Sequence, residues 1–126
     1  MSGGEKLRIL IADNDQAVLD LLLLDLRLEG HDVVAAAPNG EDALELHEKH
    51  QPDVVVVDFR LGPGINGVEV ARRLQGTSTR VVVFTNYITP DVIAGATTAG
   101  AVVIEKGNLN ALRRAITDRE LRRDRP

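Results

Sequence analysis

The segment VVVVDFRLGPGING, residues 54–67, is the first indication of the fold. Four consecutive valines lead directly to Asp58, and the chain then becomes rich in glycine, with one proline and one asparagine. A run of β-branched residues is typical of a strand buried on both faces, as in a parallel sheet covered by helices. A buried strand that ends in an ionisable carboxylate makes Asp58 a candidate for chemistry, with capping of the strand end as the structural alternative.

The composition is that of a single globular domain. Of the 126 residues, 44% are hydrophobic and 27% are charged. Aromatic residues are so scarce that valine, leucine, isoleucine and alanine must form the core. The absence of cysteine excludes a disulfide scaffold, a thiolate metal site and a cysteine nucleophile. The net charge of −4 argues against direct nucleic-acid binding by this domain.

The sequence predicts neither a membrane span nor a signal peptide. No apolar run approaches the roughly 18 residues of a membrane span, and MSGGEK (1–6) lacks the apolar segment of a signal peptide. We therefore expect a cytoplasmic protein that does not contact the membrane. We expect the domain to span residues 5–121, followed at 122–126 by a tail or the start of an interdomain linker.

Short apolar runs alternate with longer segments of helical character along the whole chain. The expected strands are 7–12, 32–37, 53–57, 80–84 and 101–104. The expected helices are 15–30, 39–50, 66–76, 89–100 and 108–121. Three of them are expected to begin at a capping residue: Asn39, Asn66 and Thr89. Five strand–helix units in strict alternation predict an α/β domain with an open, doubly wound parallel sheet. Ligands of such folds bind beyond the carboxyl ends of the strands.

Polar residues follow several of the expected strands at this edge. They are Asp13, Asn14 and Asp15 after the first strand, Asp58 after the third, Thr85 and Asn86 at the fourth, and Lys106 after the fifth. Clustered acids need a cation. Oxygen ligands without cysteine or histidine favour Mg²⁺ or Mn²⁺ as that cation. An aspartate beside such a metal can attack phosphorus and form an acyl phosphate. Capping of the helix that begins near residue 15 is the structural alternative for Asp13.

Four motifs together resemble the receiver domain of two-component response regulators over essentially the whole chain. They are ILIADND (9–15), VVVVDFRL (54–61) with its later NG (66–67), VVVFTN (81–86) and AGAVVIEKG (99–107). Each is weak alone, but their order and their placement at strand ends are specific. The resemblance implies a flavodoxin-like (βα)5 fold with strand order 2-1-3-4-5.

The resemblance also implies roles for individual residues. Asp58 matches the phospho-acceptor, and Asp13 and Asn14 match the acidic pair that binds Mg²⁺ together with Asp58. Arg60 matches the position whose backbone carbonyl completes the metal shell, so its side chain is uninformative in this reading. Thr85 and Lys106 match the hydroxyl and the ammonium that contact the phosphoryl group.

The chain departs from the family pattern at several positions. Asn14 replaces the second acid, the direct metal ligand, with an uncharged amide, which predicts weaker Mg²⁺ binding. The loop after Asp58 has one extra residue, expected to be absorbed in Gly62–Gly64. Val103 stands at the aromatic switch position, so rotation of an aromatic ring cannot transmit the signal.

Three functions follow from these residues. The first is a receiver that takes a phosphoryl group from a sensor histidine kinase or phosphotransfer protein and is not an enzyme in the metabolic sense. Its output face would comprise helix 89–100, strand 101–104 and helix 108–121, which is also a candidate homodimer interface. The second is a degenerate receiver that acts as an interaction module without phosphorylation. The third is an aspartyl phosphohydrolase, disfavoured because Arg60 stands where a general acid is expected.

Two further groups of side chains have structural interpretations. His47 and His50 are expected to be solvated near the end of a helix, because no acid or cysteine completes a metal site. The leucines at 21–24 and 26 are expected to pack against the sheet and not to form a partner surface.

Overall fold

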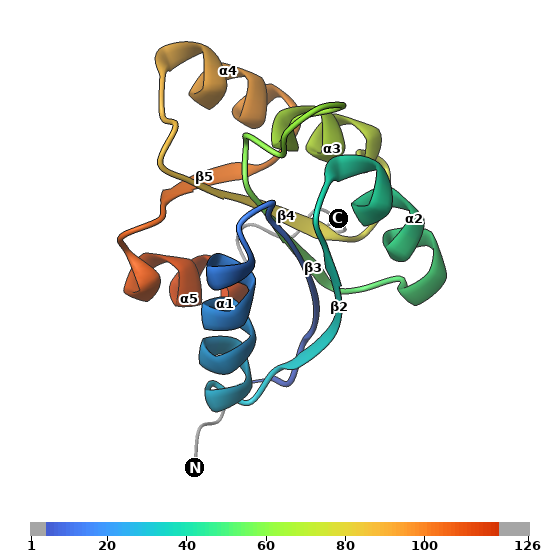
Figure 1. Ribbon diagram of the computed structural model, residues 1–126, viewed down its shortest axis with the longest axis vertical. Coiled ribbons are helices and arrows are strands. Elements are labelled where there is room, and N and C mark those ends of the chain that lie inside the picture. The colour runs from blue at the N-terminus through green and yellow to red at the C-terminus, as the bar shows by residue number, and fades with distance from the viewer. Residues whose placement is uncertain (1–4, 119–126) are drawn as a thin grey trace.

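Five parallel strands form one sheet in a computed structural model that describes residues 5–118 (Figure 1). The strands are β1 (Arg8–Ala12), β2 (Asp32–Ala37), β3 (Val54–Val57), β4 (Arg80–Thr85) and β5 (Val102–Glu105). The helices are α1 (Gln16–Leu28), α2 (Gly40–His50), α3 (Gly67–Arg73), α4 (Pro90–Thr98) and α5 (Leu109–Thr117). The strand order is β2-β1-β3-β4-β5, so the predicted flavodoxin-like, doubly wound fold is confirmed.

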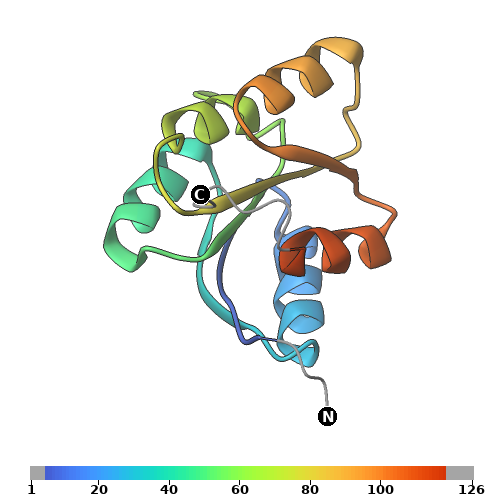
Figure 2. The same cartoon turned by 180° about the vertical axis from the view of Figure 1, so that it is seen from behind.

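The valine run of β3 lies in the middle of the sheet and is buried on both faces. Val54 and Val56 belong to the core under α1 and α5, whereas Val55 and Val57 belong to the core under α2, α3 and α4. Figures 1 and 2 show this division from opposite sides, with α1 and α5 on one side of the sheet and the other helices across it. Successive side chains of β3 point to opposite faces, and both faces are covered by helices. Every position of β3 therefore needs an apolar residue, which explains the four consecutive valines.

A polar side chain caps the amino end of each helix. Asn39, Asn66 and Thr89 accept hydrogen bonds from backbone N–H groups of α2, α3 and α4, as the sequence predicts. The cap of α1 is Asp15, whose carboxylate accepts from Ala17 N. The alternative that Asp13 caps this helix is therefore wrong.

Some helix bounds and side-chain environments differ from the expectations. The helix predicted to end at Gly76 ends at Arg73, and α5 ends at Thr117. The rest of the predicted domain, to residue 121, and the tail at 122–126 lie outside the described residues. Within residues 5–118, no helix is long and apolar enough to cross a membrane.

The histidine and leucine expectations need correction. His47 is buried, and its Nε2 lies 2.8 Å from Thr79 Oγ1, so it is not solvated. On α1, Leu22 and Leu26 are buried as predicted, but Leu21 and Leu24 are exposed. The five leucines at 21–24 and 26 therefore do not all pack against the sheet.

Candidate functional site

The strand order brings the predicted site residues to one edge of the sheet. Ala12 pairs with Val57, so Asp13 and Asp58 follow directly from neighbouring strands. Thr85 pairs with Glu105, and Lys106 N donates to Thr85 O at 3.1 Å. Because parallel strands end at the same edge, residues separated by up to 93 positions in sequence become neighbours, as the numbers 13 and 106 show.

Lys106 joins the two aspartates. Its Nζ lies 2.8 Å from Asp13 Oδ2 and 2.9 Å from Asp58 Oδ2. Burial lowers the pKa of Lys106, but the hydrogen bonds to both carboxylates outweigh it and the pKa is raised. Burial raises the pKa of Asp13, although Lys106 and the N–H of Asp15 oppose this change. The ammonium therefore compensates two carboxylates that are otherwise poorly solvated.

A cavity of about 240 Å³ opens beside this charge cluster. It is lined by Asp58, Arg60, Thr85, Asn86, Tyr87 and Lys106. Thr85 is buried, and its hydroxyl oxygen accepts from Tyr87 N at 3.0 Å. The cavity thus combines a carboxylate, a hydroxyl and an ammonium, which can hold a group that carries negative oxygens.

The predicted metal ligands are oxygen donors, which suit a hard cation, but they do not include a cluster of three acids. Asp58 Oδ1 is buried and has no hydrogen-bond partner among residues 5–118, so it is available as a ligand. Asp15 is directed to the cap of α1, and within residues 5–118 no three His, Cys, Asp or Glu side chains could together hold a metal ion. The oxygen donors that remain are Asp13, Asp58, the Asn14 amide and the Arg60 carbonyl, a set suited to Mg²⁺.

Asn14 is solvent-exposed, unlike the two aspartates of this set. Its side chain is exposed next to the loop after Asp58, where a Cβ added at Gly62 would lie 3.8 Å from Asn14 Nδ2. Asp13, by contrast, is only 2% exposed and is held by Lys106. If Asp13 and Asn14 bound a cation, this amide and carboxylate would bring one negative charge fewer than a pair of acids.

The side chain of Arg60 has a role that the sequence interpretation missed. Its guanidinium carbon lies 3.7 Å from the centroid of the Tyr87 ring. Tyr87 also stacks on Phe59, with 5.4 Å between ring centroids and 11° between their planes. These residues follow the ends of β3 and β4, and that placement was the signal available in the sequence. Arg60 and Tyr87 both line the cavity beside Asp58, and Phe59 packs on Tyr87.

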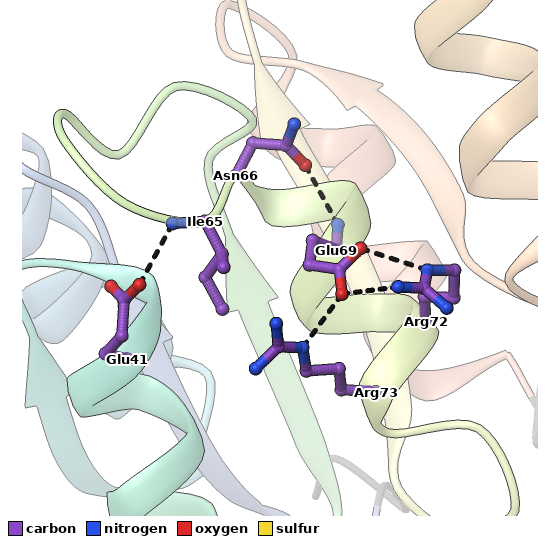
Figure 3. Close-up of polar contacts among 6 residues, drawn as sticks. All are labelled: Glu41, Ile65, Asn66, Glu69, Arg72 and Arg73. Carbon is purple, nitrogen blue, oxygen red and sulfur yellow. Dashed lines mark hydrogen bonds and ion pairs between the residues drawn. The ribbon is translucent and has the colours of Figure 1, made fainter.

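The loop after Asp58 is fixed at its far end by α2. Figure 3 shows Glu41 accepting a hydrogen bond from Ile65 N, at 3.1 Å, and Asn66 accepting one from Glu69 N. Gly62 and Gly64 have φ values of 81° and 102°, a conformation that favours glycine. Both glycines lie in the segment expected to absorb the extra residue, and that expectation stays a prediction.

Close packing also connects the start of α3 to the candidate acceptor. A Cβ added at Gly67 would lie 2.2 Å from the backbone oxygen of Asp58. Gly67 N donates to Phe59 O at 2.9 Å. Glu69, in the same turn, accepts hydrogen bonds from the side chains of Arg72 and Arg73, and these hydrogen bonds lower its pKa (Figure 3). The loop is thus held by backbone contacts at both of its ends.

Comparison with known proteins identifies the family. The family model described as the response regulator receiver domain matches residues 9–117. Among curated relatives, the transcriptional regulatory protein PdtaR of Mycobacterium tuberculosis is 35% identical over 97 residues, which are 75% of this chain and 46% of that protein. The transcriptional regulatory protein AfsQ1 of Streptomyces coelicolor is 37% identical over 84 residues, 67% of this chain and 36% of that protein. The chain spans less than half the length of these relatives.

Solved structures agree with this assignment. The signal receiver domain of the response regulator NarL from Mycobacterium tuberculosis has a TM-score of 0.81 at 29% identity, covering 91% of this chain and 99% of that one. The BeF3-activated N-terminal receiver domain of Klebsiella pneumoniae RstA has a TM-score of 0.74 at 28% identity, covering 86% and 97%. The chain belongs to the family of response regulator receiver domains of two-component systems.

Proposed function

We propose that this receiver accepts a phosphoryl group on Asp58 with the help of Mg²⁺. The observation that carries the proposal is the joint contact of Lys106 with Asp13 and Asp58, beside a cavity that Thr85 also lines. This arrangement supplies a nucleophile, an ammonium and a hydroxyl that can donate to negative oxygens, and space for a phosphoryl group. The activated receiver among the solved neighbours, described as BeF3-activated, supports the same reading.

The residues divide the chemistry among them. One carboxylate oxygen of Asp58 attacks phosphorus and forms the acyl phosphate, while the bond from phosphorus to the donor's leaving atom breaks. Lys106 stabilises the negative oxygens of the transferring group, and the Thr85 hydroxyl is near enough to the cavity to donate to one of them. Asp13, Asn14, Asp58 and the Arg60 carbonyl would hold Mg²⁺, which neutralises charge on the incoming phosphoryl group.

We propose a sensor histidine kinase or a phosphotransfer protein as the donor. The output surface would be the face formed by α4, β5 and α5. Thr85 ends β4, which pairs with β5, and Lys106 follows β5 directly, so both residues adjoin elements of that face. Use of this face as a homodimer interface stays a prediction. Because each molecule takes up one phosphoryl group, we propose that the domain acts as a signalling switch and not as a metabolic enzyme. We also propose a cytoplasmic location.

A degenerate receiver that works as a phosphorylation-independent interaction module is the second candidate. Asn14 favours it, because the amide brings no charge to the metal. Val103 favours it as well, because this half-buried residue packs against the core and offers no aromatic ring to rotate.

Intact mass distinguishes the two candidates. The chain is incubated with acetyl phosphate and Mg²⁺, and separately with a cognate kinase. Phospho-acceptance predicts a gain of one phosphoryl group that is lost in Asp58→Asn and on removal of Mg²⁺. No gain from either donor, with the fold intact by circular dichroism, would contradict the proposal and support the interaction module.

A further inference from the structure

Helix α1 presents an apolar stripe to solvent. Leu21, Leu24 and Leu28 are 45%, 61% and 76% exposed, and Ala17 is exposed on the same line. Within residues 5–118 they account for three of the six large hydrophobic side chains that are exposed. Their spacing of three and four residues puts them on one side of the helix, away from the buried Leu22 and Leu26. α1 lies beside α5 at the edge of the molecule in both views (Figures 1 and 2).

The stripe has the spacing of a helix-pairing seam. Residues 17, 21, 24 and 28 occupy alternating core positions of a seven-residue pattern. If two copies of α1 pack antiparallel, Leu21 of each copy meets Leu24 of the other, and Ala17 meets Leu28. The small residue therefore faces the outermost leucine, and the two central layers are filled by leucine.

The charges beside the stripe select the same arrangement. Asp20 and Arg27 are both exposed, and they lie on the same flank because they are seven residues apart. In the antiparallel pair, Asp20 of each copy lies against Arg27 of the second copy, which makes two symmetric ion pairs. Within residues 5–118, Arg27 forms no salt bridge in the single chain.

A parallel arrangement fits less well. It would bring Asp20 of one copy toward Asp25 of the other, and both side chains are acidic. Asp25 already pairs with Arg113 of α5 in its own chain, so in the antiparallel arrangement it needs no partner from the second copy. The charges thus favour one orientation of the two helices over the other.

We propose that a second copy of this chain binds the α1 stripe, forming a two-fold symmetric antiparallel α1–α1 pair. The interface is self-complementary, as a two-fold dimer requires. One helix from each copy buries less surface than a standard interface, so the dimer is weak and forms at high protein concentration. It depends on neither Asp58 nor Mg²⁺ and is separate from the proposed output face.

The α4 surface is the competing site within the described residues. It exposes Ile93, at 47%, but Asp91 is the only charged side chain of α4 (Pro90–Thr98). A second copy would therefore find no charge pair on α4 comparable to Asp20 and Arg27. This difference allows matched variants on the two surfaces.

Sedimentation equilibrium from about 10 μM to about 1 mM tests the proposal over the range expected for a weak interface. Leu24→Asp should lower the association constant at least about 100-fold, because each dimer loses two buried leucines. Asp20→Arg or Arg27→Asp alone should lower it about 3- to 30-fold, and the double variant should restore it. Ile93→Asp is the control on α4 and should leave association of the unphosphorylated chain unchanged. All four positions are exposed, so folding is checked simply by matching melting curves.

Three results would overturn the proposal. The first is a chain that stays monomeric at every concentration. This result would overturn the proposal even if a kinase bound the α1 stripe. The second is a dimer lost in Ile93→Asp but kept in Leu24→Asp. The third is a dimer that ignores the charge reversals or is not restored by the double variant, which would exclude the antiparallel pairing.

Discussion

Lys106 Nζ lies 2.9 Å from Asp58 Oδ2, although the two residues belong to loops 48 positions apart in sequence. The same nitrogen contacts Asp13, so one ammonium separates two carboxylates that are 2% and 9% exposed. Because the pKa of Lys106 is raised, its contribution to stability is fully present below the ordinary value of 10.5 and is lost as pH rises above the raised value.

Replacing Lys106 with methionine should therefore expose the repulsion between Asp13 and Asp58. We expect the free energy of unfolding to fall by about 1–3 kcal/mol at pH 7 without Mg²⁺, since two buried carboxylates lose their partner. The loss should shrink toward pH 4, where a carboxylate can protonate, because burial already raises the pKa of Asp13. Lys49→Met, at an exposed position of α2, is the matched control. Equal urea-denaturation curves for the two variants would show that the Lys106 contacts do not stabilise the fold.

Asn14→Asp should strengthen Mg²⁺ binding. The new carboxylate would add one unit of negative charge to the groups that bind Mg²⁺. Its attraction to the cation gains several kcal/mol in gross Coulomb energy, most of which desolvation and repulsion cancel. A net gain of about 1–2 kcal/mol corresponds to roughly 5- to 30-fold tighter binding in a calorimetric titration. Without Mg²⁺ the variant should melt at a lower temperature than the parent chain. Unchanged affinity would mean that the metal ligand is Asp13 or Asp15 and that ADND is wrongly aligned.

Gly64 and Glu41 should be energetically coupled. Gly64→Ala is expected to destabilise the fold by about 1–3 kcal/mol, since its φ is 102° and the new Cβ would lie 2.6 Å from Glu41 Oε1. In a Glu41→Ala background only the backbone strain remains, so the second change should cost about 0.5–1.5 kcal/mol less. A double-mutant cycle measured by thermal unfolding checks this coupling. Strict additivity would show that the loop does not rest on Glu41.

His47 should make stability fall in mild acid. Thr79 Oγ1 donates to Pro52 O and so accepts from Nε2–H of a neutral His47. Burial lowers the pKa of His47 below its ordinary 6.5, so below that value the unfolded chain binds more protons than the folded one. The stability difference between the parent chain and His47→Gln should therefore be larger at pH 7.5 than at pH 5. A difference that does not change with pH would contradict a neutral, buried His47.

Much of the fold could be predicted because local chemistry and tertiary packing agree. The valines of β3 need to be apolar on both faces, and Asn39, Asn66 and Thr89 cap helices in the way their sequence positions predict. The convergence of Asp13, Asp58, Thr85 and Lys106 follows from strand order, which came from the resemblance to the family. Periodicity alone does not determine which parallel strands are neighbours.

Other features depend on contacts between distant segments. Four consecutive leucines cannot all face the sheet from a helix with 3.6 residues per turn. Leu21 and Leu24 therefore lie on the side of α1 that faces solvent. His47 is buried because Thr79, 32 residues away, lies against it. The stack of Arg60 on Tyr87 joins loops after two different strands, and no local pattern encodes that contact.

The chemical identity of the acceptor residue tests the central claim most directly. The chain is treated with acetyl phosphate and Mg²⁺, the acyl phosphate is reduced with borohydride, and the peptides are sequenced by mass spectrometry. Reduction converts a phosphorylated aspartate to homoserine, and we expect homoserine at position 58 alone. Homoserine at position 13 or 15, or its absence at position 58 in a phosphorylated sample, would contradict the assignment of Asp58 as the phospho-acceptor.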